Sequence, residues 1–511
     1  MLDDDACYRA VLARDARFDG WFFSAVRTTG VFCRPSCPAR TPHRRNIAFH
    51  PTAAAAVRAG FRACLRCRPD TTPGSPEWNL AGDVAARAVR AINDGVVDRE
   101  GIPGLADRLG YSVRQLHRLL TSSLGAGPIE LARAHRAATA RTLLETTELP
   151  VTQVAFASGF RSTRQFNDTI RDVFACTPTA LRHRRRAAAP RSTGSELTLR
   201  LALRPPYAAG PLFQFLAARA VEGVEVGDAT RYARTMALPH AAGTCDVDAP
   251  APDATWVTCR LRLDDFRDLP AAVERTRRLL DLDADPVAVD AVLRRDAVLR
   301  PGVARNPGIR VPGHVDGDEV AIRAILGQQV SVAAATRLAG VLTERYGGTV
   351  PSDGPLCRMF PDAATIAKLD PEELPMPRAR GRTLVELCRS LADGTVRLDA
   401  AADRDDVAAS LGAIKGVGPW TVSYVRMRAL GDPDAFLPGD LALRRALERL
   451  GRPSSERGAT EAAQSWRPYR SYAMVHLWSH DAAAAPRARV TSTRRSSAPR
   501  SRTTSKGEGR T

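Results

Sequence analysis

Hydrophobic positions recur with two different periods along this chain, and the changes of period divide it into regions. Apolar residues at helical spacing run through residues 77–186 and again from 311 to 478. Between these regions, apolar and polar residues alternate over 197–203, and short runs of the same kind lie near 255–263. The pattern therefore predicts two helical regions separated by a small antiparallel sheet.

Stretches rich in turn-forming or charged residues mark the boundaries between these regions. Proline, threonine and glycine gather at 69–74, and the basic run 182–186 is followed by three alanines and Pro190. The last thirty or so residues are rich in Arg, Ser and Thr, a composition typical of a disordered basic tail. These marks predict segments at 1–73, 77–186, 196–305, 306–481 and 482–511.

The overall charge narrows the range of partners. A chain of 511 residues with a formal net charge of +18 is expected to hold about three or four domains and to favour a polyanionic partner. Part of the excess charge lies in the tail, so charge alone does not establish DNA binding. No stretch approaches the roughly 20 apolar residues of a membrane span. We therefore expect a cytoplasmic protein that does not enter a membrane.

Two close cysteine pairs near the N-terminus supply the first candidate site. Cys33, Cys37, Cys64 and Cys67 have a spacing that can converge on one tetrahedral Zn²⁺. By themselves such cysteines fit an inert zinc knuckle equally well. Their surroundings, from Thr28-Thr29-Gly30-Val31-Phe32-Cys33-Arg34-Pro35-Ser36-Cys37 to Gly60-Phe61-Arg62-Ala63-Cys64-Leu65-Arg66-Cys67, closely resemble the N-terminal domain of the Ada family of bacterial adaptive-response proteins.

The resemblance to Ada implies a chemical role for one cysteine. In that family the zinc-bound thiolate at the position of Cys33 takes methyl groups from DNA phosphotriesters. The residues at positions near the DNA backbone in the family are Thr29, Arg40, Arg62 and Arg66. Four thiolates around Zn²⁺ carry a formal charge of −2 that repels phosphates, and methylation of Cys33 lowers it to −1. The transfer would thus strengthen DNA binding and act as a switch that activates promoters together with RNA polymerase.

Two helix-turn-helix patterns follow the cysteine region. In one, Gly159 suits a tight turn between helices and Ser162 with Gln165 forms a capping-box pattern that opens the next helix. Ser112 with Gln115 repeats the pattern upstream, and the pair resembles the AraC-type DNA-binding domain. Candidates for base or phosphate contacts, each of which could instead lie on a solvated face, are Arg114, Gln115, Arg118, Arg161, Arg164, Gln165 and Asn167.

A glycine hairpin followed by an aspartate characterises the C-terminal part. Gly416 and Gly418 make a turn that can expose backbone N–H groups, beside Lys415, to a DNA phosphate, and Asp440 follows in Leu437-Pro438-Gly439-Asp440. This layout resembles the helix-hairpin-helix base-excision glycosylases, and specifically the AlkA family of 3-methyladenine DNA glycosylases. The resemblance covers most of 197–481 and makes Asp440 the catalytic carboxylate that stabilises positive charge on the deoxyribose. Asp440 could also simply cap the next helix.

The same resemblance places aromatic residues in a base pocket and shows two departures. Positions that match the family's pocket, although core packing would explain them too, are Phe215, Trp420, Tyr424 and Trp478. Trp420 stands where bifunctional relatives carry a lysine, which argues for a monofunctional glycosylase. Gln329 replaces a leucine wedge that fills the gap left by a flipped base, and Leu441 replaces an aromatic residue.

Together these features predict a mainly α, multidomain protein with α+β parts. We expect a small zinc domain, an all-α tandem helix-turn-helix domain, a small antiparallel α+β domain, an all-α helix-hairpin-helix glycosylase domain and a disordered tail. The sequence resembles a fusion of the Ada and AlkA families, with Zn²⁺ as cofactor and double-stranded DNA as partner. Two alternatives remain open: a transcriptional regulator with a catalytically inactive glycosylase-like half, and a glycosylase whose N-terminal domains only increase DNA affinity.

Overall fold

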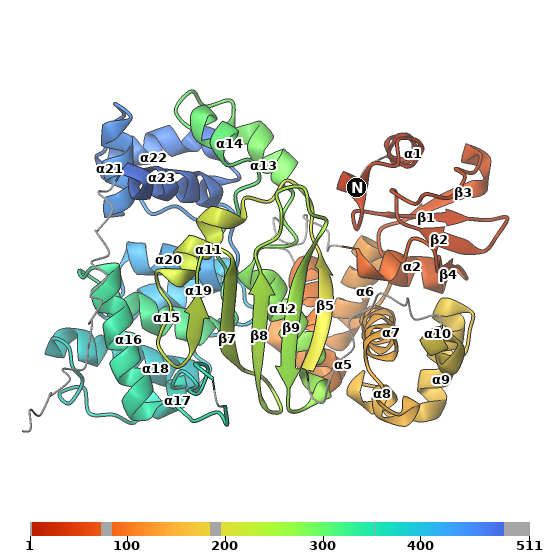
Figure 1. The fold of residues 1–511 in the computed structure, drawn as a ribbon, viewed down its shortest axis with the longest axis horizontal. Coiled ribbons are helices and arrows are strands. Elements are labelled where there is room, and N and C mark those ends of the chain that lie inside the picture. Colours follow the sequence, from red (N-terminus) through yellow and green to blue (C-terminus); the bar gives the residue numbers. More distant parts are fainter. Residues whose placement is uncertain (1–2, 73–83, 184–195, 353, 485–511) are drawn as a thin grey trace, which may run out of the picture.

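The computed structural model describes residues 3–72, 84–183, 196–352 and 354–484. The helix–sheet–helix order expected from the hydrophobic periods is confirmed, and the fold is multidomain. The linker at 184–195 and the tail from 485 onward lie outside the described residues. Figure 1 shows the sheet of 196–263 in the centre, with the N-terminal domains on one side and the C-terminal helices on the other.

The N-terminal domain is a four-stranded sheet with helices against it. Its strand order is β3-β1-β2-β4, in which β2 and β4 are parallel and the other pairs are antiparallel. Phe23 and Phe32 pack edge to face under the sheet. The elements are α1 (Asp4–Leu12), η1 (Ala16–Phe18), β1 (Phe23–Val26), β2 (Val31–Cys33), η2 (Arg44–Asn46), β3 (Ile47–His50), α2 (Ala53–Arg58), β4 (Arg62–Ala63) and η3 (Pro69–Thr71).

Residues 84–183 form a purely helical region. Gly110 and Gly159 adopt φ values of +77° and +80° at two helix ends, where a side chain would be strained. Ser112 and Gln115 form a complete capping box, whereas Ser162 accepts only the Gln165 backbone N–H. The helices are α4 (Val84–Asn93), α5 (Val96–Leu109), α6 (Val113–Leu124), α7 (Pro128–Thr146), α8 (Val151–Ala157), α9 (Thr163–Phe174) and α10 (Pro178–His183).

The central sheet is antiparallel throughout, with the order β5-β9-β8-β7-β6. Burial alternates along β5, β8 and β9 because one face of the sheet covers the core and the other is more exposed. Its elements are β5 (Glu196–Ala202), α11 (Ala209–Ala217), β6 (Glu225–Gly227), β7 (Arg231–Ala237), β8 (Ala242–Asp248), β9 (Trp256–Leu263), η4 (Phe266–Asp268) and α12 (Leu269–Leu279).

The C-terminal helices enclose two separate apolar cores. One core is built mainly from α15, α18 and α20, and the other from α13, α14, α21 and α23 around Trp466. Helices α13 and α14 thus pack with the end of the chain rather than with the preceding sheet. The helices are α13 (Pro286–Leu293), α14 (Arg300–Arg305), α15 (Gly317–Leu326), α16 (Val332–Tyr346), α17 (Ala363–Ile366), α18 (Arg378–Ala392), α19 (Arg404–Gly412), α20 (Pro419–Ala429), α21 (Leu441–Arg449), α22 (Glu456–Ala462), η5 (Ala463–Trp466) and α23 (Arg470–Ala484).

Candidate metal centre and candidate active site

The four cysteines predicted to bind metal converge at one end of the N-terminal sheet. Cys33 is the last residue of β2, and the parallel pairing of β2 with β4 brings it beside Cys64, which directly follows β4. Cys37 and Cys67 come from the turns that follow each strand. The four sulfur atoms all lie within 4.8 Å of one another.

This donor set fits Zn²⁺. Four sulfurs at the usual Zn–S distance lie about 3.8 Å apart around a tetrahedral ion, within the spread found here. Hydrogen bonding with Cys37 raises the pKa of the Cys33 thiol, whereas hydrogen bonding from Cys33 lowers the pKa of Cys64. Without a metal ion, a thiolate is therefore favoured at Cys64 and disfavoured at Cys33. A bound cation would stabilise the thiolate form of all four cysteines.

A buried aspartate fixes the loop between the first two cysteines. Both the backbone N–H and the hydroxyl of Ser36 donate to Asp19, at 3.0 and 2.6 Å, and Arg34 lies 3.4 Å from the same carboxylate. Asp19 is only 4% exposed. Asp19 could not be predicted from the sequence, since neither its spacing nor its neighbours mark it as part of the cluster.

The side chains predicted to face the DNA backbone lie on the surface of the N-terminal domain. Thr29, Arg40, Arg62 and Arg66 are all exposed, and Cys33 itself is 9% exposed. Arg40, Arg62 and Arg66 thus place three cations on the surface of this domain, where they can attract phosphates. The assignment of these four residues to DNA contact stays a prediction.

The first turns of α6 and α9 present polar side chains to solvent. Gln115 is partly engaged, because its side-chain oxygen accepts from the Ser112 backbone N–H and hydroxyl. Asn167 is only partly exposed, so it is the least accessible candidate. The fully exposed candidates are Arg114, Gln115, Arg118, Arg161, Arg164 and Gln165.

In the C-terminal helices, three N–H groups converge on the Asp440 carboxylate. Asp440 is the N-cap of α21, and one of its oxygens accepts the Leu443 backbone N–H at 2.9 Å. The indole N–H groups of Trp420 and Trp478 donate to the two oxygens at 3.1 and 2.9 Å. The carboxylate therefore caps a helix and is also aimed by two indoles from distant helices, so the two roles are compatible.

The aromatic residues predicted for the base pocket gather around this carboxylate in two stacked pairs. Trp420 and Tyr424 stack with ring centroids 5.0 Å apart, and Phe215 and Trp478 with centroids 5.9 Å apart. The structure thus brings together side chains from α11, α20 and α23. A flipped base would meet aromatic faces close to the carboxylate.

Two arginines form one wall of this aromatic group. The Arg219 and Arg428 guanidiniums lie 3.6 and 4.8 Å from the Phe215 ring centroid, and Arg428 donates to the Tyr424 hydroxyl at 2.7 Å. Burial acts to raise the pKa of Tyr424, but Arg428 and Arg219 outweigh it and lower that pKa. Neither arginine was singled out from the sequence, because an isolated arginine carries no motif.

The glycine hairpin adopts the turn that its sequence predicts. Gly416 has a φ of +90°, and a Cβ at this position would lie 2.2 Å from the Thr383 hydroxyl. Gly418 is the N-cap of α20. Lys415 and Gly416 are exposed and Gly418 is partly exposed. The hairpin therefore offers backbone N–H groups and a cation to solvent, as a phosphate site requires.

The loop between α15 and α16 lies against this hairpin. Gln328 donates to the Gly416 carbonyl at 3.1 Å and to the Thr421 hydroxyl at 3.2 Å. The next residue, Gln329, is exposed and adopts a φ of +56°. Leu441, the second departure from the family pattern, is 64% exposed.

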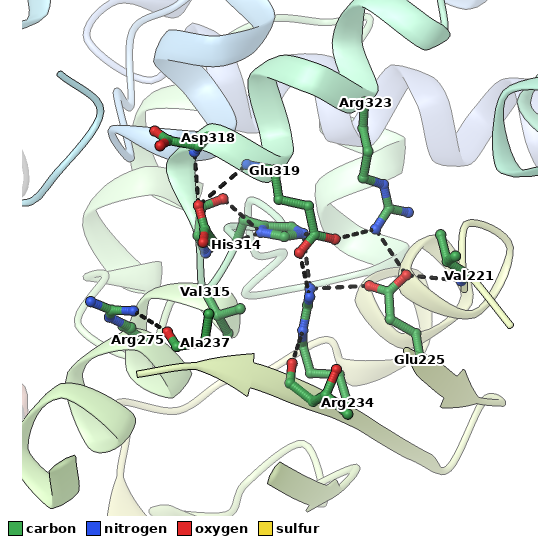
Figure 2. Close-up of polar contacts among 12 residues, drawn as sticks. Val221, Glu225, Arg234, Ala237, Arg275, His314, Val315, Asp318, Glu319 and Arg323 are labelled. Carbon is green, nitrogen blue, oxygen red and sulfur yellow. Dashed lines mark hydrogen bonds and ion pairs between the residues drawn. The ribbon is translucent and has the colours of Figure 1, made fainter. Parts of the chain in front are cut away.

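A second group of potential metal ligands is neutralised by arginines instead. Glu225, His314 and Glu319 bring their ligand atoms within 4.8 Å of one another, and all three are buried. Figure 2 shows Arg234 and Arg323 inserted between the two carboxylates, with contacts of 2.6 to 3.2 Å. Burial lowers the pKa of His314, so the imidazole is neutral and the two charges of each sign balance. This network fastens α15 to β6 and β7, and its arginines already neutralise the carboxylates that a cation would bind.

Comparison with known proteins places these features in one family. Family models match residues 6–70 as the metal-binding domain of Ada, 105–184 as a helix-turn-helix domain, 198–316 as the AlkA N-terminal domain, and 322–469 as an HhH-GPD superfamily base excision DNA repair protein. A Mycobacterium tuberculosis protein described as a probable bifunctional transcriptional activator/DNA repair enzyme AlkA is 53% identical over 482 residues, covering 94% of this chain and 97% of its own length. The chain belongs to this bifunctional family.

Two relatives match its halves separately. DNA-3-methyladenine glycosylase 2 of Escherichia coli is 34% identical over 54% of this chain and 94% of its own length. The bifunctional transcriptional activator/DNA repair enzyme Ada of the same species is 36% identical over 36% of this chain and half of its own length. The bifunctional protein is therefore a DNA-repair enzyme that joins an Ada-type zinc domain, a helix-turn-helix DNA-binding domain and an AlkA-type glycosylase domain. Among the described residues, no helix is long and apolar enough to cross a membrane.

Proposed function

We propose that this bifunctional protein carries out two separate repair reactions and uses one of them as a signal. In the N-terminal domain, the Cys33 sulfur attacks the methyl carbon of a DNA methylphosphotriester. The carbon–oxygen bond breaks, a sulfur–carbon bond forms, and the phosphate leaves as an ordinary diester anion. Bound Zn²⁺ keeps the cysteine sulfurs deprotonated at neutral pH. The transfer is irreversible for the protein, so each chain accepts one methyl group at Cys33.

The convergence of four sulfurs within 4.8 Å, in a domain that carries exposed arginines, supports this step. Arg40, Arg62 and Arg66 attract the phosphates that flank the lesion, while the methylated phosphotriester itself is neutral and escapes repulsion by the thiolates. Loss of one negative charge on methylation then strengthens DNA binding. Promoter recognition by α6 and α9 would follow, with RNA polymerase as the partner that reads out activation.

In the C-terminal half, we propose monofunctional hydrolysis of the N-glycosidic bond of alkylated bases such as 3-methyladenine. The flipped base stacks on the aromatic group formed by Phe215, Trp420, Tyr424 and Trp478. The bond to the deoxyribose breaks, the base leaves with the bonding electrons, and the Asp440 carboxylate stabilises the positive charge that develops on the sugar. Water then adds to the sugar carbon and releases a proton. Position 420 holds a tryptophan where bifunctional relatives carry a lysine, so no Schiff base forms there.

The observation that carries the glycosylase proposal is the pair of indole N–H bonds to Asp440. They fix both oxygens of a half-buried carboxylate beside aromatic surfaces, which a helix cap alone does not require. The test is excision from a duplex with one 3-methyladenine. Release of the free base with an intact DNA strand supports a monofunctional glycosylase. No release by a correctly folded protein would favour a regulator with an inactive glycosylase-like half.

A further inference from the structure

The regulator half and the glycosylase half meet at a short loop that leads into the helix-hairpin-helix motif. This docking loop, residues 399–403, directly precedes α19, and α19 leads into the glycine hairpin. On the other side of the contact are α4 and α5 of the first helix-turn-helix unit. Ala401 is only 2% exposed and packs into the apolar core of that unit.

Two aspartates in the docking loop each use one carboxylate oxygen within their own segment and the other to bind an arginine of the helix-turn-helix unit. One oxygen of Asp399 accepts the Ala401 backbone N–H at 2.7 Å, while the other accepts Arg108 of α5 at 2.5 Å. Asp403 repeats this arrangement. One of its oxygens caps α19 by accepting the backbone N–H groups of residues 405 and 406, and the other accepts Arg87 of α4 at 3.0 Å.

Further bonds run from the same helix to the loop backbone and to α12. Arg87 also donates to the Ala401 carbonyl at 2.7 Å, and Arg90 donates to the Ala400 carbonyl at 3.3 Å. At the turn after α4, Asp94 pairs with Arg275 of α12 at 3.1 Å. Helix α4 is thus held between the docking loop and the AlkA N-terminal domain. A flexible tether between independent domains would need none of these contacts.

We propose that the first helix-turn-helix unit is a platform that positions the glycosylase hairpin, so that the glycosylase's affinity for damaged DNA depends on the regulator half of the same chain. The unit offers α6 to solvent while α4 and α5 hold the start of α19. Replacement of Arg87 and Arg108 by alanine removes the ion pairs that hold the N-terminus of α19. The hairpin that binds the DNA backbone then becomes more mobile. The chemistry at Asp440, which comes from other elements, stays unchanged.

This inference rests on the proposed glycosylase activity, and its test can be read from both sides of the contact. In the full chain, Arg87→Ala with Arg108→Ala removes the cations. Asp399→Asn with Asp403→Asn removes the negative charges but keeps an oxygen for each backbone N–H, so the loop retains its own hydrogen bonds. We expect either pair to raise KM for excision of 3-methyladenine about ten-fold with kcat within a factor of two. Amide hydrogen exchange over 404–418 should become faster.

Arg133→Ala is the matched control, because Arg133 pairs with Asp172 at 2.6 Å entirely within the helix-turn-helix domain. It should change neither KM nor the exchange rates. An unchanged KM and unchanged exchange in both double variants would overturn the platform proposal. If the wild type releases no base at all, the proposed glycosylase function fails instead, and the exchange rates alone then decide whether α4 and α5 hold the hairpin.

Discussion

The cysteine cluster and the Asp440 site are each predicted to hold a reactive anion, but they are assembled in different ways. The cysteine sulfurs come from strand ends and turns within some 35 residues of chain, so local pairing of β2 with β4 nearly builds the site. Asp440 depends on Trp420 and Trp478, which belong to different helices and donate to different oxygens. The first site needs an ion to complete it, whereas the second is completed by packing.

This difference predicts how each site fails. Loss of one cysteine ligand should weaken metal binding and destabilise the small N-terminal domain. Loss of one hydrogen bond to Asp440 should shift the position of its carboxylate while the domain stays folded.

Cys33→Ser should abolish methyl acceptance completely, because a neutral hydroxyl is a far weaker nucleophile than a thiolate. Intact-protein mass spectrometry after incubation with DNA that carries methylphosphotriesters measures the added methyl group. Cys357→Ser, a partly exposed cysteine away from the cluster, should accept methyl as the wild type does. Continued methylation of a Cys33→Ser protein that still binds zinc would show that another residue is the acceptor.

Asp440→Asn should lower kcat for excision by about 10²–10³-fold, the usual cost of losing one electrostatic stabiliser of the transition state. Asparagine is also a good N-cap, so α21 should persist. Asp362→Asn at the N-cap of α17 is the control, since Asp362 is an exposed cap remote from the pocket. Full activity of the Asp440→Asn protein would leave this carboxylate with a capping role alone.

Trp420→Phe and Trp478→Phe should each lower kcat by roughly ten-fold, because each removes one N–H donor to a charged oxygen but keeps an aromatic ring. Trp466→Phe is the matched control, because it removes an indole N–H that does not contact Asp440. Its indole donates to Asp296 at 2.9 Å inside a buried core, so it should lower the melting temperature and leave kcat unchanged. Equal kcat values for all three variants would argue against a positioning role for the two indoles.

A fall in pH should have the smallest of these effects, a decrease in the free energy of unfolding caused by His476. His476 in α23 is 4% exposed, its ring nitrogens have no hydrogen-bond partner among the described residues, and burial lowers its pKa to about 4. Because the unfolded chain binds this proton near pH 6.5, the stabilisation is complete above pH 6.5 and is lost as the pH falls toward 4. The loss is about 3 kcal/mol at most.

Denaturant unfolding at pH 7 and pH 4.5 checks this expectation, with His476→Leu as the comparison. The variant should lose less stability than the wild type over this interval, since leucine has no proton to bind in the unfolded state. An identical pH dependence in both proteins would show that His476 does not cause the loss of stability in acid.

The local features of the fold could be predicted from the sequence. Strand alternation, the turns at Gly110 and Gly159 and the hairpin at Gly416 all follow from rules that act over a few residues, and the cysteine spacing implied a common ion. The convergence of Trp420 and Trp478 on Asp440 could be expected only from family resemblance, because helices that are distant in sequence bring them together. The roles of the individual DNA-facing residues remain predictions.

Other contacts carried no signal in the sequence. Asp19 and Arg428 act through tertiary contacts that no motif records. The ion pairs of Arg87 and Arg108 with the docking loop join residues roughly three hundred positions apart, and each arginine resembles many others in this arginine-rich chain. The buried network of Glu225, Arg234 and Glu319 is likewise visible only once β6, β7 and α15 are packed together.

Two separate anions in one chain are proposed to perform two separate repair reactions. The most direct test incubates four proteins with one duplex that carries both a methylphosphotriester and a 3-methyladenine. These are the wild type, Cys33→Ser, Asp440→Asn and the double variant. We predict that Cys33→Ser loses only methyl acceptance, that Asp440→Asn slows only base release, by about 10²–10³-fold, and that the double variant shows both defects. Impairment of both reactions in a folded single variant, or either reaction at the wild-type rate in the double variant, would contradict this separation.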